Sequence, residues 1–328
     1  MNNSDRRAPG SEIGCIAITG GTGSFGSAFA RFLLAETPCK IRLISRDEHK
    51  HEALMRDLND ARVTFILGDV RDEAKMRIVL SGADTVVHAA ALKTVPAGER
   101  HIGEFVRTNI MGSEHVIRAC WSVGVQRVLL VSSDKAVAAL NAYGKTKAVA
   151  EEIFVQANQF GAARGLKSSV VRGGNVWGSR GSVVELWRRA LKRGEALHVY
   201  DRKATRFHLP MSDWTRYCWR VLNEMHGGEI FVPKLRAWSL EDLARAFGGE
   251  VIYNGARHGD KRHESLVAPG EMRRMKSIDW SYVIEPSDEL QSTWNYAPLA
   301  GHYAPEGAWY TSEHGDFLSV KELQELIR

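Results

Sequence analysis

A glycine-rich turn between a short apolar run and a helical pattern is the feature that most constrains what this chain can fold into. Residues 13–18 form the apolar run, which predicts a buried strand, and the helical pattern covers residues 28–35. Between them lies Thr19-Gly20-Gly21-Thr22-Gly23-Ser24-Phe25-Gly26. Glycines at these spacings allow a tight turn, a close backbone approach to a pyrophosphate and close packing of the helix on the strand. The helix N-terminus then faces the phosphates, so we expect a dinucleotide to bind here.

Strand and helix patterns alternate through the first half of the chain. After the first strand, apolar runs predict further strands at residues 41–44, 63–67, 85–88 and 127–131. Such alternation is typical of an α/β fold with a Rossmann-type, doubly wound parallel sheet. Ligands of such sheets lie beyond the carboxyl ends of the strands, which is where we look for the site.

The composition changes near residue 180, where the alternating patterns give way to basic and aromatic segments. We therefore predict a disordered segment at residues 1–12, a dinucleotide-binding Rossmann domain at 13–178 and a smaller cap at 179–328. The cap is expected mainly to bind substrate, with some of its segments returning to the Rossmann domain. A helix over residues 240–246, with Ser239 as its N-cap, belongs to the cap.

The end of the second strand indicates which dinucleotide binds. An acidic residue at this position usually holds the ribose 2′-hydroxyl of NAD, whereas an arginine suits the 2′-phosphate of NADP. Here the strand ends in Ser45-Arg46-Asp47, and Lys50 adds positive charge nearby. We therefore favour NADP over NAD, the alternative being that Arg46 is an ordinary surface arginine. Asp69, at the next strand end, can accept a hydrogen bond from the adenine amino group.

Two motifs after the fifth strand point to proton-transfer chemistry. Tyr143 and Lys147 are spaced to lie on one face of a helix. An ammonium group beside a phenol lowers the phenol's pKa, which makes Tyr143 a candidate base for an alcohol whose carbon loses hydride. Asp134 and Lys135 add an acid and a second base, which an elimination needs and an oxidation alone does not. The alternative for this pair is a solvated turn.

Bulk composition excludes several classes of function. The 328 residues are 44% hydrophobic and 25% charged, which are ordinary globular values. A net charge of +5 suits an anionic small molecule, and no basic block is long enough to predict nucleic-acid binding. The four cysteines lack metal-type spacing, so we expect no metal site and reduced thiols, as in the cytoplasm. Residues 1–12 do not resemble a signal peptide and no apolar run is long enough to span a membrane, so no membrane association is expected.

Taken together, these motifs resemble those of one family. The first half is similar to an extended short-chain dehydrogenase/reductase, and the order of motifs from about residue 13 to the C-terminus resembles the soluble, inverting UDP-N-acetylglucosamine 4,6-dehydratases. The motifs that carry this resemblance are Ser45-Arg46-Asp47-Glu48-His49-Lys50, Gly68-Asp69-Val70-Arg71-Asp72, His88-Ala89-Ala90-Ala91-Leu92-Lys93, Ser132-Ser133-Asp134-Lys135-Ala136-Val137, Asn175-Val176-Trp177-Gly178-Ser179-Arg180-Gly181-Ser182-Val183, Thr205-Arg206-Phe207, Gly228-Glu229-Ile230-Phe231-Val232-Pro233-Lys234 and Phe317-Leu318-Ser319-Val320.

The resemblance implies a reaction. In this family bound NADP+ oxidises the 4-hydroxyl of the sugar, the 4-ketone acidifies C5–H, water leaves from C6, and the hydride returns to C6. The product is a 4-keto-6-deoxy sugar with C5 inverted. By the same resemblance Tyr143 is the base at O4, Lys147 lowers its pKa and holds the cofactor ribose, Lys135 takes the C5 proton, and Asp134 protonates the departing hydroxyl.

Residues and resemblance together give the expected binding sites. The residues expected to contact the cofactor are Gly20, Thr22, Gly23, Ser24, Phe25, Gly26, Ser45, Arg46, Lys50, Asp69, Val70, Ala89, Ala90, Lys93, Ser132, Tyr143, Lys147 and Val176. The residues expected to contact a UDP-sugar are Lys93, Lys135, Asn175, Arg180, Gly181, Ser182, Arg206, Arg257 and Asp260. Arginine forks suit phosphate oxygens and can stack on uracil.

The sequence departs from the family pattern near the expected sugar and nucleotide pocket. Thr94 replaces a histidine, Gly173 a tyrosine and Glu185 a proline; Ala138-Ala139 replaces Asn-Pro, and Lys203-Ala204 replaces Glu-Met. The reaction type is therefore better supported than the sugar. Other readings are a dehydratase that stops at a 5,6-ene sugar, a UDP-sugar 4-epimerase, in which Asp134 and Lys135 would be idle, and a non-catalytic NADP sensor.

The resemblance also implies a homo-oligomer, a dimer or a larger assembly up to a hexamer. Extended dehydrogenases of this type commonly pair through the helices that flank the sheet. Here those helices are expected at residues 102–123 and 143–160, where the apolar positions exceed what one sheet face needs. The positions in question are Val106, Ile110, Val116, Val149 and Ile153.

Overall fold

The strand that precedes the glycine-rich turn lies inside the main sheet and has a parallel neighbour on each side. The computed structural model describes residues 13–256, 259–305 and 309–327. Its main sheet has ten strands in the order β16-β14-β15-β10-β6-β5-β4-β1-β2-β3. The strands are β1 (Cys15–Thr19), β2 (Lys40–Ser45), β3 (Val63–Leu67), β4 (Thr85–His88), β5 (Arg127–Ser133), β6 (Lys167–Gly173), β10 (Ile230–Pro233), β14 (Met275–Ser277), β15 (Ser281–Ile284) and β16 (His302–Tyr303).

Pairing from β3 through β10 is parallel, and the last three strands are antiparallel additions from the second half of the chain. The doubly wound α/β fold predicted from the sequence is thus confirmed. The predicted strands coincide with β2 to β5 to within two residues, and the predicted first strand is observed as β1. Every residue of β1 is buried, as expected for a strand covered on both faces.

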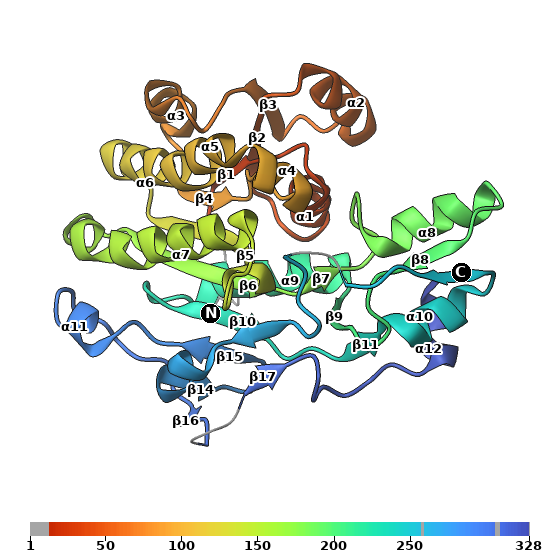
Figure 1. Cartoon of the computed structure of the whole chain (residues 1–328). Coiled ribbons are helices and arrows are strands. Elements are labelled where there is room, and N and C mark those ends of the chain that lie inside the picture. The colour runs from red at the N-terminus through yellow and green to blue at the C-terminus, as the bar shows by residue number, and fades with distance from the viewer. Residues whose placement is uncertain (1–12, 257–258, 306–308, 328) are drawn as a thin grey trace, which may run out of the picture.

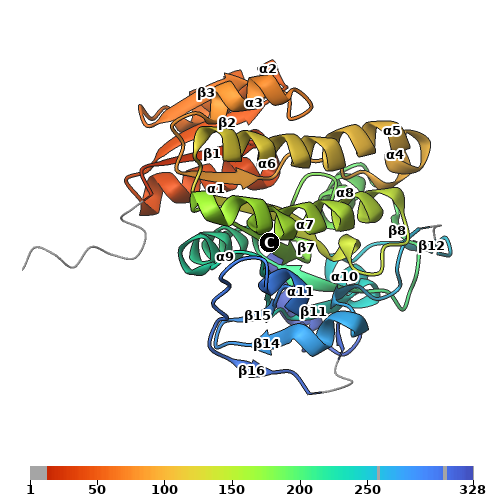
Figure 2. The same cartoon turned by 90° about the vertical axis from the view of Figure 1, so that its left-hand side faces the viewer.

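Helices cover both faces of this sheet. One face carries α3 (Glu73–Leu80), α6 (Gly112–Val123) and α7 (Ala142–Gly161), and the other carries α1 (Ser24–Glu36), α2 (Glu48–Leu58) and α9 (Met211–Glu224). Figure 2 shows α6 and α7 running side by side. Before α6 the chain passes through α4 (Val95–Arg100), α5 (Ile102–Phe105) and the π-helical stretch η1 (Val106–Met111).

Smaller elements of the second half gather at one end of the sheet, where Figure 1 shows α8, α10 and α12. A third core packs there around Trp187, Leu197, Trp238, Leu243 and Leu323. The elements are β7 (Asn175–Val176), α8 (Val183–Lys192), β8 (Leu197–Val199), β9 (Thr205–Leu209), β11 (Ala237–Ser239), α10 (Leu240–Phe247), β12 (Val251–Tyr253) and α12 (Val320–Ile327). The remaining elements are β13 (Ser265–Val267), β17 (Tyr310–Thr311), α11 (Asp288–Gln291) and the 3-10 turns η2 (Asp134–Ala136), η3 (Ala162–Arg164) and η4 (Pro269–Arg274).

Several local predictions can be compared with these elements. Ser239 is the N-cap of α10, and its hydroxyl accepts a hydrogen bond from Asp242 N at 2.9 Å, as predicted. Of the apolar positions assigned to an oligomer contact, Val106 and Val149 are exposed, at 37% and 43%, whereas Val116 is fully buried in the core. The oligomer itself stays a prediction, as do the two domain boundaries. Residues 1–12 lie outside the described part of the chain.

None of the described helices combines the length and the apolar character that crossing a bilayer takes.

Two close backbone contacts hold the predicted site elements together. Gly20 has a φ of 70°, and a Cβ added to it would lie 2.8 Å from the carbonyl carbon of Ala89, so the turn after β1 presses on the end of β4. Gly144, in the first turn of α7, lies so close to η2 that an added Cβ would overlap the carbonyl oxygen of Lys135. The contact at Gly144 sets how near Tyr143 lies to the Asp134–Lys135 turn.

We predict that Gly144→Ala lowers the free energy of unfolding by about 2 kcal/mol, because α7 has to move away from η2. Gly103→Ala is the matched control, since Gly103 is also helical but has no atom within 4 Å of an added Cβ. Replacing a helical glycine without a clash gains up to about 1 kcal/mol. Urea denaturation of both variants measures the difference, and equal stabilities would contradict the contact.

Candidate active site

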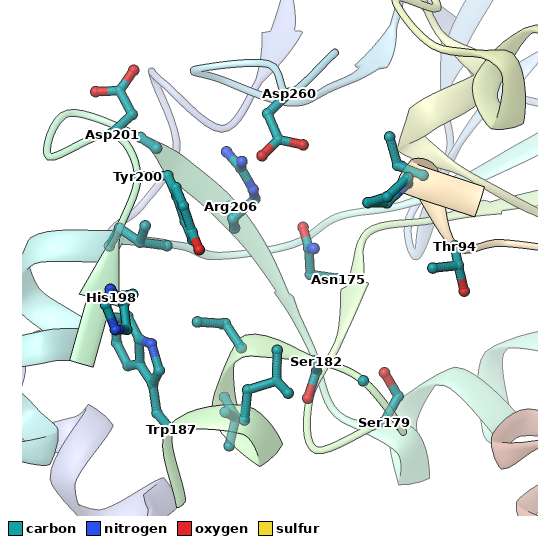
Figure 3. A pocket seen from close by; sticks show the side chains of 18 of the residues that line it. Thr94, Asn175, Ser179, Ser182, Trp187, His198, Tyr200, Asp201, Arg206 and Asp260 are labelled. Atoms are coloured by element: carbon teal, nitrogen blue, oxygen red, sulfur yellow. The ribbon is translucent and has the colours of Figure 1, made fainter. Parts of the chain in front are cut away.

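A cavity of about 940 Å³ lies beyond the carboxyl ends of β5 and β6, between the sheet and the elements of the second half. Thr94 borders it on one side, and Trp187 and His198 border it on the other (Figure 3). Lys135, one of the predicted catalytic residues, also lines the cavity. The cavity lies where ligands of doubly wound sheets bind.

Asp134, which is buried, and Lys135, which is partly exposed, form an ion pair at the end of β5. Lys135 Nζ lies 3.1 Å from Asp134 Oδ1, and the Ser133 hydroxyl donates to the same oxygen at 2.8 Å. Burial raises the pKa of Asp134, and Glu264 raises it further, which favours the protonated acid. Burial alone would lower the pKa of Lys135, but Asp134 and Glu264 outweigh it and hold the pKa above its usual value. The solvated turn considered for this pair is therefore wrong.

Tyr143 and Lys147 face this turn from the first two turns of α7. Burial raises the pKa of Tyr143 to about 12, and a hydrogen bond with Ser133 opposes that rise only in part. The expected lowering of this pKa by Lys147 is thus not observed: the Lys147 ammonium donates to Val131 O at 2.8 Å, and burial lowers its own pKa to about 8. In this structure Ser133 and Lys135, rather than Lys147, are the groups that favour the phenolate.

Three residues of the site were not predicted from the sequence. Ser133 links Asp134 and Tyr143, as described above. Glu264 is completely buried and lies 2.7 Å from Lys135 Nζ, and Lys261 donates to Asp134 O at 3.1 Å and to Val137 O. Lys261 and Glu264 follow the predicted Asp260 in the sequence, but no local pattern places them against a turn more than 120 residues earlier.

The dinucleotide end fits a bound pyrophosphate. Gly23 precedes α1 without a side-chain cap, so the first backbone N–H groups of α1 are left for an external acceptor. Gly26 lets the helix reach the turn, since an added Cβ would lie 2.6 Å from Gly20 O. Arg180 reaches across to this turn and donates to Thr22 O at 2.6 Å and to Ser24 Oγ at 3.3 Å. Arg180 thus lies between the predicted cofactor and substrate sites.

The end of β2 carries exposed positive charge, as predicted. Arg46 lies 3.5 Å from Asp69 and Lys50 lies 2.5 Å from Asp47, and both cations are about half exposed. Asp47 is the N-cap of α2 and accepts from Lys50 N, so its carboxylate has a structural role. Asp69 also binds Arg71, with Arg71 Nη2 2.6 Å away.

Other predicted cofactor residues divide into two groups. Thr22 donates to Ser45 Oγ at 2.9 Å, which places both hydroxyls at the turn, and Val176 lines the cavity. By contrast, the Ser132 hydroxyl donates to Glu151, which also binds Arg172, so this side chain belongs to a buried ion network. Phe25 packs on Trp214, and Val70 is buried against Gly112. Ala89 and Ala90 contact Gly20, as described above.

Most predicted substrate residues line the cavity. They are Lys93, Lys135, Asn175, Arg180, Gly181, Ser182, Arg206 and Asp260. In Figure 3 Arg206, Asn175 and Asp260 point towards one another across its centre. Lys93 donates to Arg180 O at 3.3 Å, and burial followed by repulsion from Arg180 lowers its pKa. Arg257 lies outside the described residues.

The departures from the family pattern have different structural consequences. Only Thr94 and Ala204 line the cavity. Trp214 fills the space beside Gly173, whose added Cβ would lie 2.9 Å from the indole. Glu185, in the first turn of α8, accepts a hydrogen bond from the backbone N–H of Gly181, the residue before the N-cap Ser182. Ala138 has a φ of 43°, a left-handed conformation that asparagine adopts more readily than alanine.

Comparison with known proteins agrees with this geometry. Residues 16–286 match the family described as polysaccharide biosynthesis protein. Over 95% of its length the chain is 35% identical to an inverting UDP-N-acetylglucosamine 4,6-dehydratase from Campylobacter jejuni, of which the match covers 96%. The chain therefore belongs to the family described as polysaccharide biosynthesis protein. It is also 36% identical to a UDP-glucose 4-epimerase from Rickettsia bellii, covering 95% of this chain and 94% of that one.

Solved structures agree on the fold. The chain resembles Pen from Bacillus thuringiensis with a TM-score of 0.87 and 29% identity, over 96% of this chain and 98% of that chain. A dTDP-glucose 4,6-dehydratase from Streptomyces venezuelae, with NAD bound, gives a TM-score of 0.69 at 22% identity, over 88% of this chain and 92% of that one. The relatives support a nucleotide-sugar dehydratase, with epimerases among them.

Proposed function

We propose that this protein is an NADP-dependent 4,6-dehydratase of a UDP-N-acetylhexosamine, most simply UDP-N-acetylglucosamine, that inverts C5. The observation that carries the proposal is the Asp134–Lys135 pair, in which a buried carboxyl group contacts a lysine that lines the cavity. An elimination needs one group to take a proton from C5 and another to give a proton to the leaving hydroxyl. A 4-epimerase needs neither.

Each step assigns a proton to a named residue. Tyr143 takes the O4 proton while C4 loses hydride, which leaves a 4-ketone. Lys135, in its free-amine form, takes the proton from C5, and the electron pair forms the C5–C6 double bond as Asp134 protonates the departing hydroxyl. After hydride reaches C6, a proton returns to C5 and completes the 6-deoxy sugar. The atoms balance: the hydride taken from C4 ends at C6, and the sugar loses one molecule of water, made of the C6 hydroxyl and a proton.

The cofactor end has residues that suit NADP. The turn of Gly20, Gly23 and Gly26 would hold the pyrophosphate at the N-terminus of α1, and Arg46 and Lys50 would hold a 2′-phosphate. When bound, the nicotinamide accepts a hydride and gives it back within one cycle. Related structures carry NAD, as in the UDP-glucuronic acid 4-epimerase of Bacillus cereus, so the choice of NADP rests on the two cations.

We predict that the purified protein converts UDP-N-acetylglucosamine without added cofactor to a product 18 mass units lighter. Mass spectrometry of the product separates dehydration from epimerisation, which leaves the mass unchanged. NMR then distinguishes a 4-keto-6-deoxy sugar from a 5,6-ene and reports the C5 configuration. An isomer of unchanged mass would make the protein an epimerase.

Tyr143→Phe and Asp134→Asn should stop the reaction at different stages. Each should slow turnover by about 10²–10⁴-fold, the usual cost of losing a general acid or base. Tyr143→Phe acts before hydride transfer, so the cofactor should stay oxidised. Asp134→Asn should allow the ketone to form and reduced cofactor to accumulate. Absorbance at the reduced nicotinamide band during turnover measures this, and the same redox state in both variants would contradict the separate roles.

Arg46→Ala should weaken NADP(H) binding at least about tenfold and leave NAD(H) binding nearly unchanged, because only the 2′-phosphate contact is lost. Arg56→Ala is the matched control, since Arg56 lies in the last turn of α2, the helix that also contains Lys50. Chromatography of the nucleotide released on denaturation identifies the native cofactor. Release of NAD alone from the unaltered protein would overturn the preference.

A further inference from the structure

A buried carboxylate that the proposed mechanism leaves without a role lies directly behind Lys135. Glu264 has no exposed surface, and its Oε1 is 2.7 Å from Lys135 Nζ. Arg206 Nε is 3.6 Å from the same oxygen, and Lys261 Nζ is 3.8 Å from Oε2. An uncompensated buried carboxylate is costly, so these cations keep Glu264 ionised and in place.

Hydrogen bonds also hold the backbone of Glu264 in place. Glu264 N donates to Ser312 Oγ at 2.9 Å, and Ser312 N donates to Glu264 O at 2.8 Å. Ser312 is itself fully buried. The backbone of Glu264 is therefore held by Ser312, from the second half of the chain, and the distance from its carboxylate to Lys135 depends on how that half packs on η2.

Lys261 fixes the same turn from the other side. Its ammonium donates to Asp134 O at 3.1 Å and to Val137 O. Asp134 is the first residue of η2, and Val137 directly follows its last residue. Next to it, Gly259 O accepts from Asn141 Nδ2 at 2.9 Å. The segment from Gly259 to Glu264 thus contacts both η2 and the residue before α7.

We propose that Glu264 is a positioning residue, which holds the Lys135 ammonium between itself and Asp134 and, through its charge, sets the protonation of both catalytic side chains. This inference rests on the proposed function for its catalytic meaning. Lys135 Nζ lies 2.7 Å from Glu264 Oε1 and 3.1 Å from Asp134 Oδ1, so the two carboxyl groups together restrict where the amine can lie. The amine therefore faces C5 in one fixed orientation rather than as a free side chain.

The charges around Lys135 predict the direction in which its pKa and that of Asp134 shift when the charge of Glu264 is removed. Asp134 and Glu264 are the anions that face it, Arg206 and Lys261 are the nearby cations, and the Tyr143 phenol lies beside it on α7. Removing the charge of Glu264 lowers the pKa of Lys135, and it also lowers the pKa of Asp134, because Glu264 is one of the groups that raise it. Both limbs of the pH–rate profile should then move to lower pH.

Glu264→Gln tests the inference with and without substrate. Trace acetylation with acetic anhydride across pH, read by peptide mass spectrometry, follows the fraction of Lys135 present as free amine. We expect its midpoint to fall by about one pH unit or more, since one opposite charge at this distance shifts a pKa by about 1–3 units. An unchanged midpoint overturns the inference whether or not the protein is a dehydratase.

Two further variants complete the test. Glu285→Gln is the matched control, because Glu285 is also buried and paired with a lysine, Lys276 at 2.8 Å, but lies at the far end of the sheet. It should leave the Lys135 midpoint and the pH profile unchanged. Glu264→Asp keeps the charge but shortens its reach, so the midpoint should stay near that of the unaltered protein while kcat falls.

The outcomes distinguish a failure of the proposed dehydratase function from a failure of the positioning role of Glu264. If the unaltered protein dehydrates no UDP-sugar, the proposed function fails, and the acetylation midpoints still decide the role of Glu264. If Glu264→Gln does not fold, Glu264→Asp decides alone, and an unaltered kcat in that variant overturns the positioning role. A fall of the midpoint in Glu264→Asp as large as in Glu264→Gln would show that charge is not responsible.

Discussion

A buried cluster of charges joins the two halves of this chain. Glu264 and Asp134 are the carboxyl groups of the cluster, and Lys135, Lys261 and Arg206 are its basic groups. Taking such charges out of water costs several kcal/mol for each ion unless partners and hydrogen bonds replace the solvent. The turn after β5, strand β9 and the segment before β13 must therefore converge for any of them to be buried. Because the catalytic pair belongs to this cluster, the site is complete only when the second half of the chain is packed on the sheet.

Backbone proximity brings the oxidation and elimination groups to one place. Gly144 allows α7 to touch the carbonyl of Lys135, and Ser133 then bonds to both Asp134 and Tyr143. The price of this compactness is burial, which raises the pKa of Tyr143 and Asp134 alike. A raised pKa suits Asp134 as an acid. For Tyr143 it means that the resting phenol keeps its proton, so in the proposed reaction proton transfer would accompany the loss of hydride from the sugar.

The catalytic turn and the substrate cavity differ in how far they depart from the family pattern. The acid, the bases and their contacts are all present, whereas Thr94 and Ala204 change the cavity wall. Other departures are absorbed elsewhere: Trp214 fills the space beside Gly173, and Glu185 accepts a hydrogen bond from the backbone N–H of Gly181. Thr94 and Ala204 change the lining of the cavity, so the reaction type proposed for this site is better supported than the identity of the sugar.

The sequence by itself determined the α/β fold and the glycine-rich turn, and it predicted the two residue pairs proposed as catalytic. These depend on local signals: apolar runs of strand length, glycines at fixed spacing, and side chains four apart on a helix. Even the cap of α10 at Ser239 was readable, because an N-cap bonds only to its own first turn. Tertiary structure alone decided which groups surround Lys135 and what burial does to the pKa of Tyr143. It also gave the Ser132 hydroxyl to Glu151 and brought Arg180 to the glycine turn. Each of these depends on residues far apart in the chain meeting in a low-dielectric interior, where desolvation and long-range charge pairs outweigh anything that local spacing encodes.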